Sequence, residues 1–135
     1  MKKIQFVLFL AFLMVSATAF TPGKKGNVEV LYFKANLACC KARACNALES
    51  KVKAVVEKNY PDGSVTFRQV KLSDTLNQEL INRYNAQSQT LVIVKTSKKK
   101  VTSADVSDIL RDFVASNDTS KFEKELTGKI NELLD

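Results

Sequence analysis

The sequence contains no histidine. This absence excludes a Ser-His-Asp triad, a Cys-His pair, histidine-ligated zinc and attachment of c-type haem. Tryptophan is also missing, and neither a GxxxxGK[ST] phosphate loop nor a GxGxxG turn occurs. Any chemistry must therefore come from thiols, carboxylates, amines or hydroxyls.

One uncharged run of nearly membrane-spanning length, from Ile4 to Thr21, follows two lysines at the N-terminus. Its strongly apolar part, Phe6 to Val15, has the short length of a signal-peptide core, and Ala17 and Ala19 form an A-x-A cleavage pattern. We therefore predict a signal peptide over residues 1–19, in preference to a retained anchor. The expected location is the periplasm or the exterior, with membrane attachment only if this segment is retained.

We expect a short linker over residues 20–27 and one domain over residues 28–135, because this length suits a single hydrophobic core. Two of the 21 basic residues lie in the predicted signal peptide, so the remaining chain has a net charge of +5. No aromatic residues are interleaved with a basic stripe. The excess charge is therefore interpreted as a solvated surface, and nucleic-acid binding is not expected.

Hydrophobic periodicity predicts alternating strands and helices. The alternating string VEVLYF predicts a first strand over residues 28–33, and apolar residues at helical spacing predict an amphipathic helix over residues 42–60. A strand over residues 64–72 follows, and then a helix capped near Ser73 or Asp74 that carries Leu76 on its apolar face. The string LVIVK predicts a third strand, with a hairpin leading into a fourth.

Two helices are predicted at the C-terminal end. The first covers Ala104 to Ser116, and the second begins at a capping box formed by Ser120 and Glu123. The predicted fold class is therefore α/β: a thioredoxin-like fold with a central mixed four-stranded sheet, in the order βαβαββα, and an additional C-terminal helix.

All three cysteines, Cys39, Cys40 and Cys45, lie between the first predicted strand and the first predicted helix. A thiol at a helix N-terminus faces unpaired backbone N–H groups and the positive end of the helix dipole, which favour the thiolate. Lys41 and Arg43 add positive charge beside it. These three cysteines are the candidate catalytic residues.

The spacing of the cysteines limits which of them can pair. Residues five apart in an unbroken helix have Cα atoms about 8 to 9 Å apart, beyond the limit of about 7 Å for a disulfide. Cys40 and Cys45 could therefore pair only if Lys41 to Ala44 form a loop and the helix begins near Cys45. A disulfide to Cys45 would leave either Cys39 or Cys40 free.

Three functions fit this cluster. The favoured one is a redox-active pair in which Cys39 or Cys40 attacks and Cys45 is its partner. The second is a site for a soft ion such as Cu(I) or a thiophilic metalloid, held by all three thiolates. The third is an inert disulfide or buried thiols in a redox-inactive adaptor that presents the helical face around Phe113 and Phe122 to a partner.

The chain resembles a group of small exported thioredoxin-like bacterial proteins, the nitrophenyl-compound nitroreductase subunit ArsF-like family. The resemblance runs from about Val28 to the C-terminus. Its strongest pieces are VEVLYF, CNALES, VVEKNY, LVIVK and DTSKFEKELTGKINELL. Members typically carry C-x-x-C, so the resemblance implies that Cys45 is the second family cysteine and Cys39 the first, with about three extra residues between them.

The resemblance implies the fold more strongly than the reaction. A nitroreductase needs an electron carrier such as flavin, and no sequence feature here would hold one. Ordinary thioredoxins have a cis-proline just before the third strand, where this chain has Gln89 or Thr90. We expect a trans peptide bond there, because a cis bond without proline costs about 2.5 to 4 kcal/mol.

The sequence thus predicts an exported thiol–disulfide oxidoreductase with a non-standard cysteine cluster. No cofactor is expected. The expected partner is a redox protein or a thiol substrate, whose identity and direction of electron flow the sequence leaves open.

Overall fold

The computed structural model describes residues 28–36, 40–98 and 100–135 of the chain. The described elements are four strands, four α-helices and one short 3-10 helix. In chain order they are β1 (Val28–Lys34), α1 (Cys40–Asn59), β2 (Val65–Lys71), η1 (Thr75–Asn77), α2 (Gln78–Arg83), β3 (Leu91–Ser97), β4 (Lys100–Asp105), α3 (Ser107–Ser116) and α4 (Thr119–Leu134). The predicted signal peptide and linker lie outside the described residues. Among the helices described, none combines the length and the apolar character needed to cross a bilayer.

The four strands form one mixed sheet in the order β2-β1-β3-β4. Strands β1 and β2 are parallel, whereas β3 is antiparallel to both β1 and β4. A parallel pair requires a crossover connection, which α1 provides, and the antiparallel strands β3 and β4, consecutive in the chain, form a hairpin. The protein is therefore a mixed α/β structure, as the sequence predicts at this level.

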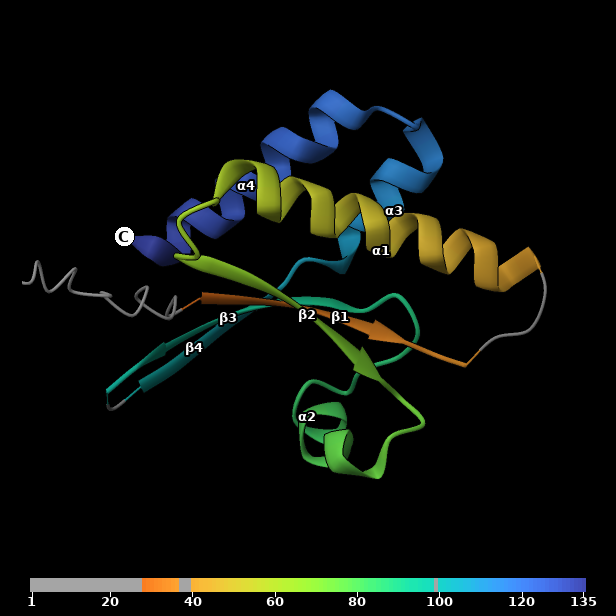
Figure 1. The fold of residues 1–135 in the computed structure, drawn as a ribbon, viewed down its shortest axis with the longest axis horizontal. Coiled ribbons are helices and arrows are strands. Elements are labelled where there is room, and N and C mark those ends of the chain that lie inside the picture. The colour runs from red at the N-terminus through yellow and green to blue at the C-terminus, as the bar shows by residue number, and fades with distance from the viewer. Residues whose placement is uncertain (1–27, 37–39, 99) are drawn as a thin grey trace, which may run out of the picture.

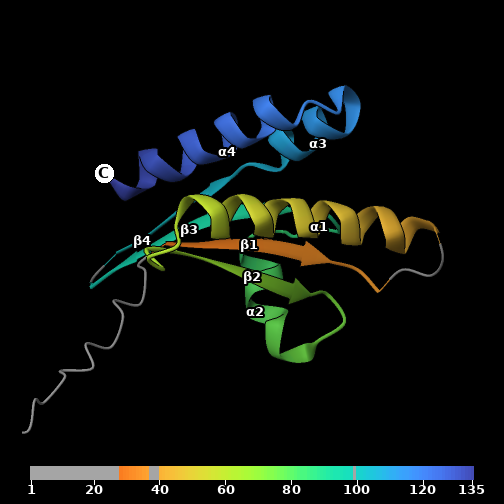
Figure 2. The ribbon, with the colours of Figure 1, turned by 45° about the horizontal axis from the view of Figure 1, so that its top comes forward.

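Helices cover both faces of the sheet, but unequally (Figure 1). Helices α1, α3 and α4 lie over one face, and α2 lies under the other. The larger core lies beneath the three helices. Alternate residues of β1 and β3 point to this face, and they pack against apolar side chains of α1, α3 and α4. Figure 2 shows α4 running along the same side of the sheet as α1. The short α2 covers a smaller core that includes Leu31, Phe33 and Val92.

The second predicted helix is shorter than expected and begins with a 3-10 turn. Asp74 caps this turn, as predicted, by accepting a hydrogen bond from the Leu76 backbone N–H at 3.0 Å. The prediction that Leu76 lies on the apolar face is wrong, because this side chain is 90 % exposed. A 3-10 helix has three residues per turn, so the spacing that would bring Leu76 onto an α-helical face does not apply.

Two predicted boundaries near the C-terminus are wrong. Ala104 belongs to β4, where it pairs with Ile93, and α3 begins only at Ser107. The predicted capping box is also absent, because Asp118 caps α4 by accepting a hydrogen bond from the Lys121 backbone N–H at 2.9 Å. An aspartate two residues upstream took the cap in place of Ser120, since both residue types are strong caps.

The expected adaptor surface around Phe113 and Phe122 does not exist as an exposed face. Phe122 is fully buried and Phe113 is buried, and their rings pack against each other with centroids 4.7 Å apart. The contact joins α3 to α4. The two phenylalanines therefore stabilise the packing of these helices and are not available to a partner.

Candidate functional site

The cysteine-containing segment lies at the edge of the sheet where β1 and β2 end. Because β3 runs antiparallel to β1, the loop before β3 lies at the same edge. Figure 1 shows α1 beginning beyond the carboxyl end of β1. The chain therefore brings together the start of α1, the ends of two strands and the loop over residues 84–90.

The helix begins earlier than the sequence indicates. Cys40 is the first residue of α1, so Cys45 lies in its second turn. Lys41 to Ala44 are helical, so the loop that a Cys40–Cys45 disulfide would require is not formed. Their Cα geometry keeps Cys40 and Cys45 about 8 to 9 Å apart, too far for a disulfide. Cys39 lies outside the described residues.

Cys45 is a free thiol and is buried, with 1 % of the residue exposed. Its surroundings are not purely apolar. The Gln89 Nε2 atom donates a hydrogen bond to the Cys45 sulfur over 3.2 Å, and the Ser88 Oγ atom lies 3.9 Å from the same sulfur. A buried thiol that is held by two polar groups differs from an inert thiol in an apolar core.

The loop before β3 is held in an unusual backbone conformation. Gln89 has a φ of 68°, in the left-handed region that non-glycine residues rarely adopt. Its backbone N–H donates to the Phe33 carbonyl at 2.8 Å, and the Phe33 N–H donates to the Thr90 carbonyl at 2.9 Å. None of the described peptide bonds is cis, so the predicted trans bond at this position is confirmed.

A polar cluster stands beside the cysteine on the same edge of the sheet. Lys34 at the end of β1 forms an ion pair with Glu49 of α1 at 2.7 Å. Gln69 of β2 donates to the same Glu49 oxygen at 3.1 Å. Helical periodicity places Glu49 one turn beyond Cys45. Nothing in the sequence indicated this cluster, because its three members come from three separate elements.

Tyr32 connects β1 to the cysteine-bearing turn of α1. The residue is fully buried, and its hydroxyl donates a hydrogen bond to the Cys45 carbonyl at 3.1 Å. Burial raises the pKa of Tyr32 well above its ordinary value, and negative charge on the neighbouring Cys45 and Glu49 side chains raises it further. Tyr32 is therefore a neutral hydrogen-bond donor at neutral pH.

A polar cavity of about 360 Å³ is lined by the loop before β3. Ser88 and Gln89, which contact the Cys45 sulfur, also line this cavity. Arg111 of α3 lines it from the opposite element. The loop that contacts the buried sulfur therefore also forms part of the cavity wall.

The described residues contain no group of three or more cysteine, aspartate or glutamate side chains that could hold a metal ion. The predicted soft-ion site also needs Cys39, which is outside this part of the chain.

Comparison with models of protein families and with curated proteins finds no match. A solved structure described as that of a malarial protein is similar over 67 % of this chain and 96 % of its own, with 21 % identity and a TM-score of 0.40.

Proposed function

We propose that this protein is an exported, thioredoxin-like thiol–disulfide exchange protein in which Cys45 is the buried partner of an attacking cysteine. The thioredoxin-like assignment is supported by the sheet order β2-β1-β3-β4, by the parallel pair joined through α1 and by helices on both faces. It also agrees with the resemblance found in the sequence.

The observation that carries the proposal is the polar environment of the Cys45 sulfur. Because only 1 % of the Cys45 residue is exposed, its thiol is shielded from bulky disulfides in solution, so it suits attack on a mixed disulfide within the chain. Two polar groups of the loop before β3, the Gln89 amide at 3.2 Å and the Ser88 hydroxyl at 3.9 Å, stand beside this sulfur. In this proposal the first attack therefore belongs to another cysteine.

We assign that first attack to Cys39, because the helical position of Cys40 prevents it from bonding to Cys45. In the reducing direction, the Cys39 thiolate attacks a substrate disulfide, and one substrate sulfur leaves as a thiolate and takes a proton. The Cys45 thiolate then attacks the Cys39 sulfur, which forms the intrachain disulfide and releases the second substrate thiolate. The substrate gains two electrons, and the protein loses two thiol hydrogens.

Peptide mapping of the oxidised protein tests this proposal. Trypsin cleaves after Lys34, Lys41, Arg43 and Lys51, so it separates residues 35–41 from residues 44–51. After mild oxidation under native conditions, we expect these two peptides to be joined by a disulfide that dithiol reduction removes.

Two matched variants identify the partner of Cys45. Cys40→Ser should keep the linked peptides, whereas Cys39→Ser should lose them, because α1 holds Cys40 too far from Cys45. The two variants should also differ in activity on a small aromatic disulfide. Cys40→Ser should release the aromatic thiolate over repeated turnovers, whereas Cys39→Ser should not. Absence of linked peptides from the oxidised wild-type protein would refute the proposal. A stable complex of the reduced protein with Cu(I) or As(III) in native mass spectrometry, lost on replacing all three cysteines by serine, would favour the soft-ion function.

A further inference from the structure

We infer that Gln89 is a further functional residue of this site, whose side-chain amide stabilises the Cys45 sulfur as a thiolate and screens it from the adjoining cavity. This inference rests on the proposed thiol–disulfide function, since it assigns a residue to that reaction. The group that acts on the sulfur is the side-chain amide N–H of Gln89.

The backbone around Gln89 is held firmly enough to aim its side chain. A left-handed conformation in a residue with a Cβ costs free energy, and persists only where the surroundings impose it. Here the two hydrogen bonds with Phe33 extend the pairing of β1 and β3 to both sides of the strained residue. The Thr90 hydroxyl also accepts a hydrogen bond from the Gln87 N–H at 2.9 Å, which closes the loop. The strain is therefore maintained by the sheet.

The Nε2–Sγ distance of 3.2 Å places a donor on the one atom of Cys45 that reacts. When the intrachain disulfide is reduced, the S–S bond breaks and the Cys45 sulfur leaves with the electron pair. A hydrogen bond to the charged acceptor is stronger than one to the neutral thiol. The Gln89 amide thus favours the thiolate over the thiol, and favours the departure and the attack of this sulfur.

Gln89 is also part of the wall between the sulfur and the cavity of about 360 Å³. Gln87 lines the same cavity from two residues earlier, but its side chain makes no hydrogen bond with Cys45 among the described residues. The chain therefore offers an internal control: the same residue type, in the same cavity, without the contact to sulfur.

The test uses protein in which Cys45 is the single thiol, made by Cys39→Ser and Cys40→Ser. Ionisation of the thiol is followed by ultraviolet absorbance against pH, with the triple cysteine-to-serine protein subtracted to remove tyrosine signals. Gln89→Glu replaces the donor with a carboxylate of the same size. We expect the ionisation midpoint of Cys45 to rise by about one pH unit or more, a tenfold loss of thiolate at fixed pH, because the hydrogen bond is lost and a like charge is placed beside the sulfur.

Gln89→Gly separates the electrostatic role from a structural one. Glycine adopts positive φ without strain, so this variant should melt no lower than the parent protein while its midpoint still rises. Gln87→Glu brings the same charge into the cavity and should leave the midpoint within about 0.3 pH units of the parent. The inference is overturned if the midpoint stays unchanged in Gln89→Gly, or if Gln87→Glu moves it as far as Gln89→Glu does.

This result is separate from the outcome of peptide mapping. If the linked peptides never form but the Gln89 variants raise the ionisation midpoint, the proposed exchange function is refuted and the role of the Gln89 amide stands. Linked peptides with an unmoved midpoint would instead refute the role of Gln89 alone.

Discussion

Tyr32 is held both by packing in the core and by a hydrogen bond to the helix that carries Cys45. Its ring belongs to the main core, and its hydroxyl reaches the carbonyl of Cys45 in α1. Alternation along β1 turns Tyr32 toward α1, because neighbouring residues of a strand face opposite sides of the sheet. The tyrosine therefore links the sheet to the turn of helix that carries the reactive sulfur.

The raised pKa of Tyr32 predicts a loss of stability in alkali. The unfolded tyrosine ionises near pH 10, whereas the folded one keeps its proton to higher pH. The folded state therefore binds more protons above pH 10, so the free energy of unfolding falls as the pH rises beyond that value. Tyr32→Phe should flatten this decline, because phenylalanine does not ionise, and should cost about 1 kcal/mol near neutral pH for the lost hydrogen bond.

Urea denaturation of both proteins from neutral pH to about pH 11 would measure the effect. Tyr84→Phe is the control, since this residue is only partly buried. An alkaline decline of equal slope in wild-type protein and Tyr32→Phe would contradict the prediction.

At the scale of elements, the junction between α3 and α4 is defined by residues with special backbone roles. Asn117 ends α3 in the left-handed conformation, with a φ of 53°, and its N–H donates to the Phe113 carbonyl. Asp118 then starts α4 as its N-cap. Asparagine tolerates the left-handed region better than most residues, and aspartate is among the preferred caps, so the two helices can meet without a longer loop.

Substitution of the cap tests which residue starts α4. Asp118→Ala should lower the free energy of unfolding by about 1 kcal/mol, because it leaves a backbone N–H of the first turn without its acceptor. Ser120→Ala should change it by less than about 0.5 kcal/mol. Chemical denaturation of the two variants decides between them, and a larger loss for Ser120→Ala would restore the capping box predicted from the sequence.

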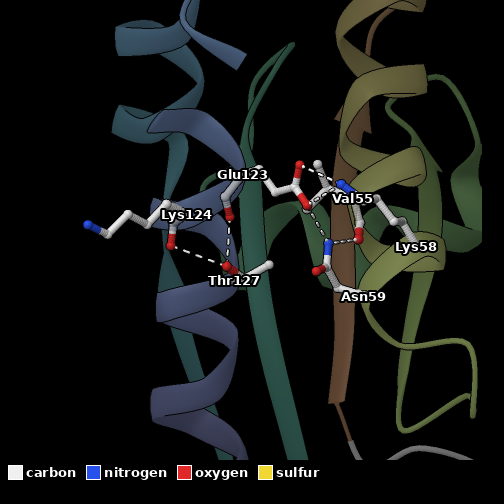
Figure 3. Close-up of polar contacts among 6 residues, drawn as sticks. All are labelled: Val55, Lys58, Asn59, Glu123, Lys124 and Thr127. Atoms are coloured by element: carbon white, nitrogen blue, oxygen red, sulfur yellow. Dashed lines mark hydrogen bonds and ion pairs between the residues drawn. The ribbon is translucent and has the colours of Figure 1, made fainter. Parts of the chain in front are cut away.

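At the scale of the whole molecule, α4 is joined to α1 by a polar seam above the shared core (Figure 3). Glu123 accepts hydrogen bonds from Lys58 at 2.8 Å and from Asn59 at 3.1 Å. Asn59 also donates to the Val55 carbonyl, and Thr127 donates to the Glu123 carbonyl. Beneath the seam, α4 buries Phe122, Leu126 and Ile130. The C-terminal helix is therefore an integral layer of the fold.

This seam predicts a dependence of stability on acid. The hydrogen bonds from Lys58 and then from Asn59 lower the pKa of Glu123 below its ordinary value near 4.5. A lowered pKa in the folded state gives stability that is present above pH 4.5 and is lost as the pH falls through the folded value. Glu123→Gln should therefore show a smaller loss of stability between pH 6 and about pH 3.

Thermal unfolding at several pH values would measure this difference. Glu125→Gln serves as the control, because the ion pair of Glu125 with Lys121, at 3.7 Å, is exposed. Identical acid profiles for Glu123→Gln and Glu125→Gln would contradict the assigned role of the seam.

Local patterns in the sequence were sufficient to predict most strands and helices. The alternation of VEVLYF and the helical spacing of Val52, Val55 and Val56 correspond to β1 and α1, because a regular element repeats its side-chain direction at a constant period. The trans bond before β3 also followed from sequence alone, because isomer preference depends on the presence of proline. The clustering of the cysteines near the end of β1 is likewise a property of the chain order.

Tertiary structure decided which of two competing helix caps is used and which residues far apart in the sequence come into contact. Asp118 and Ser120 are both good caps, and only the packing of α4 selects between them. The start of α1 at Cys40 removes one disulfide that the sequence spacing left open, and only the packing of α1 against the sheet buries Cys45. Gln89 reaches that thiol across 44 positions of sequence. The physical reason is the same in each case: a period is written into neighbouring residues, whereas burial, capping and hydrogen bonds between distant residues exist only after the sheet and helices have packed.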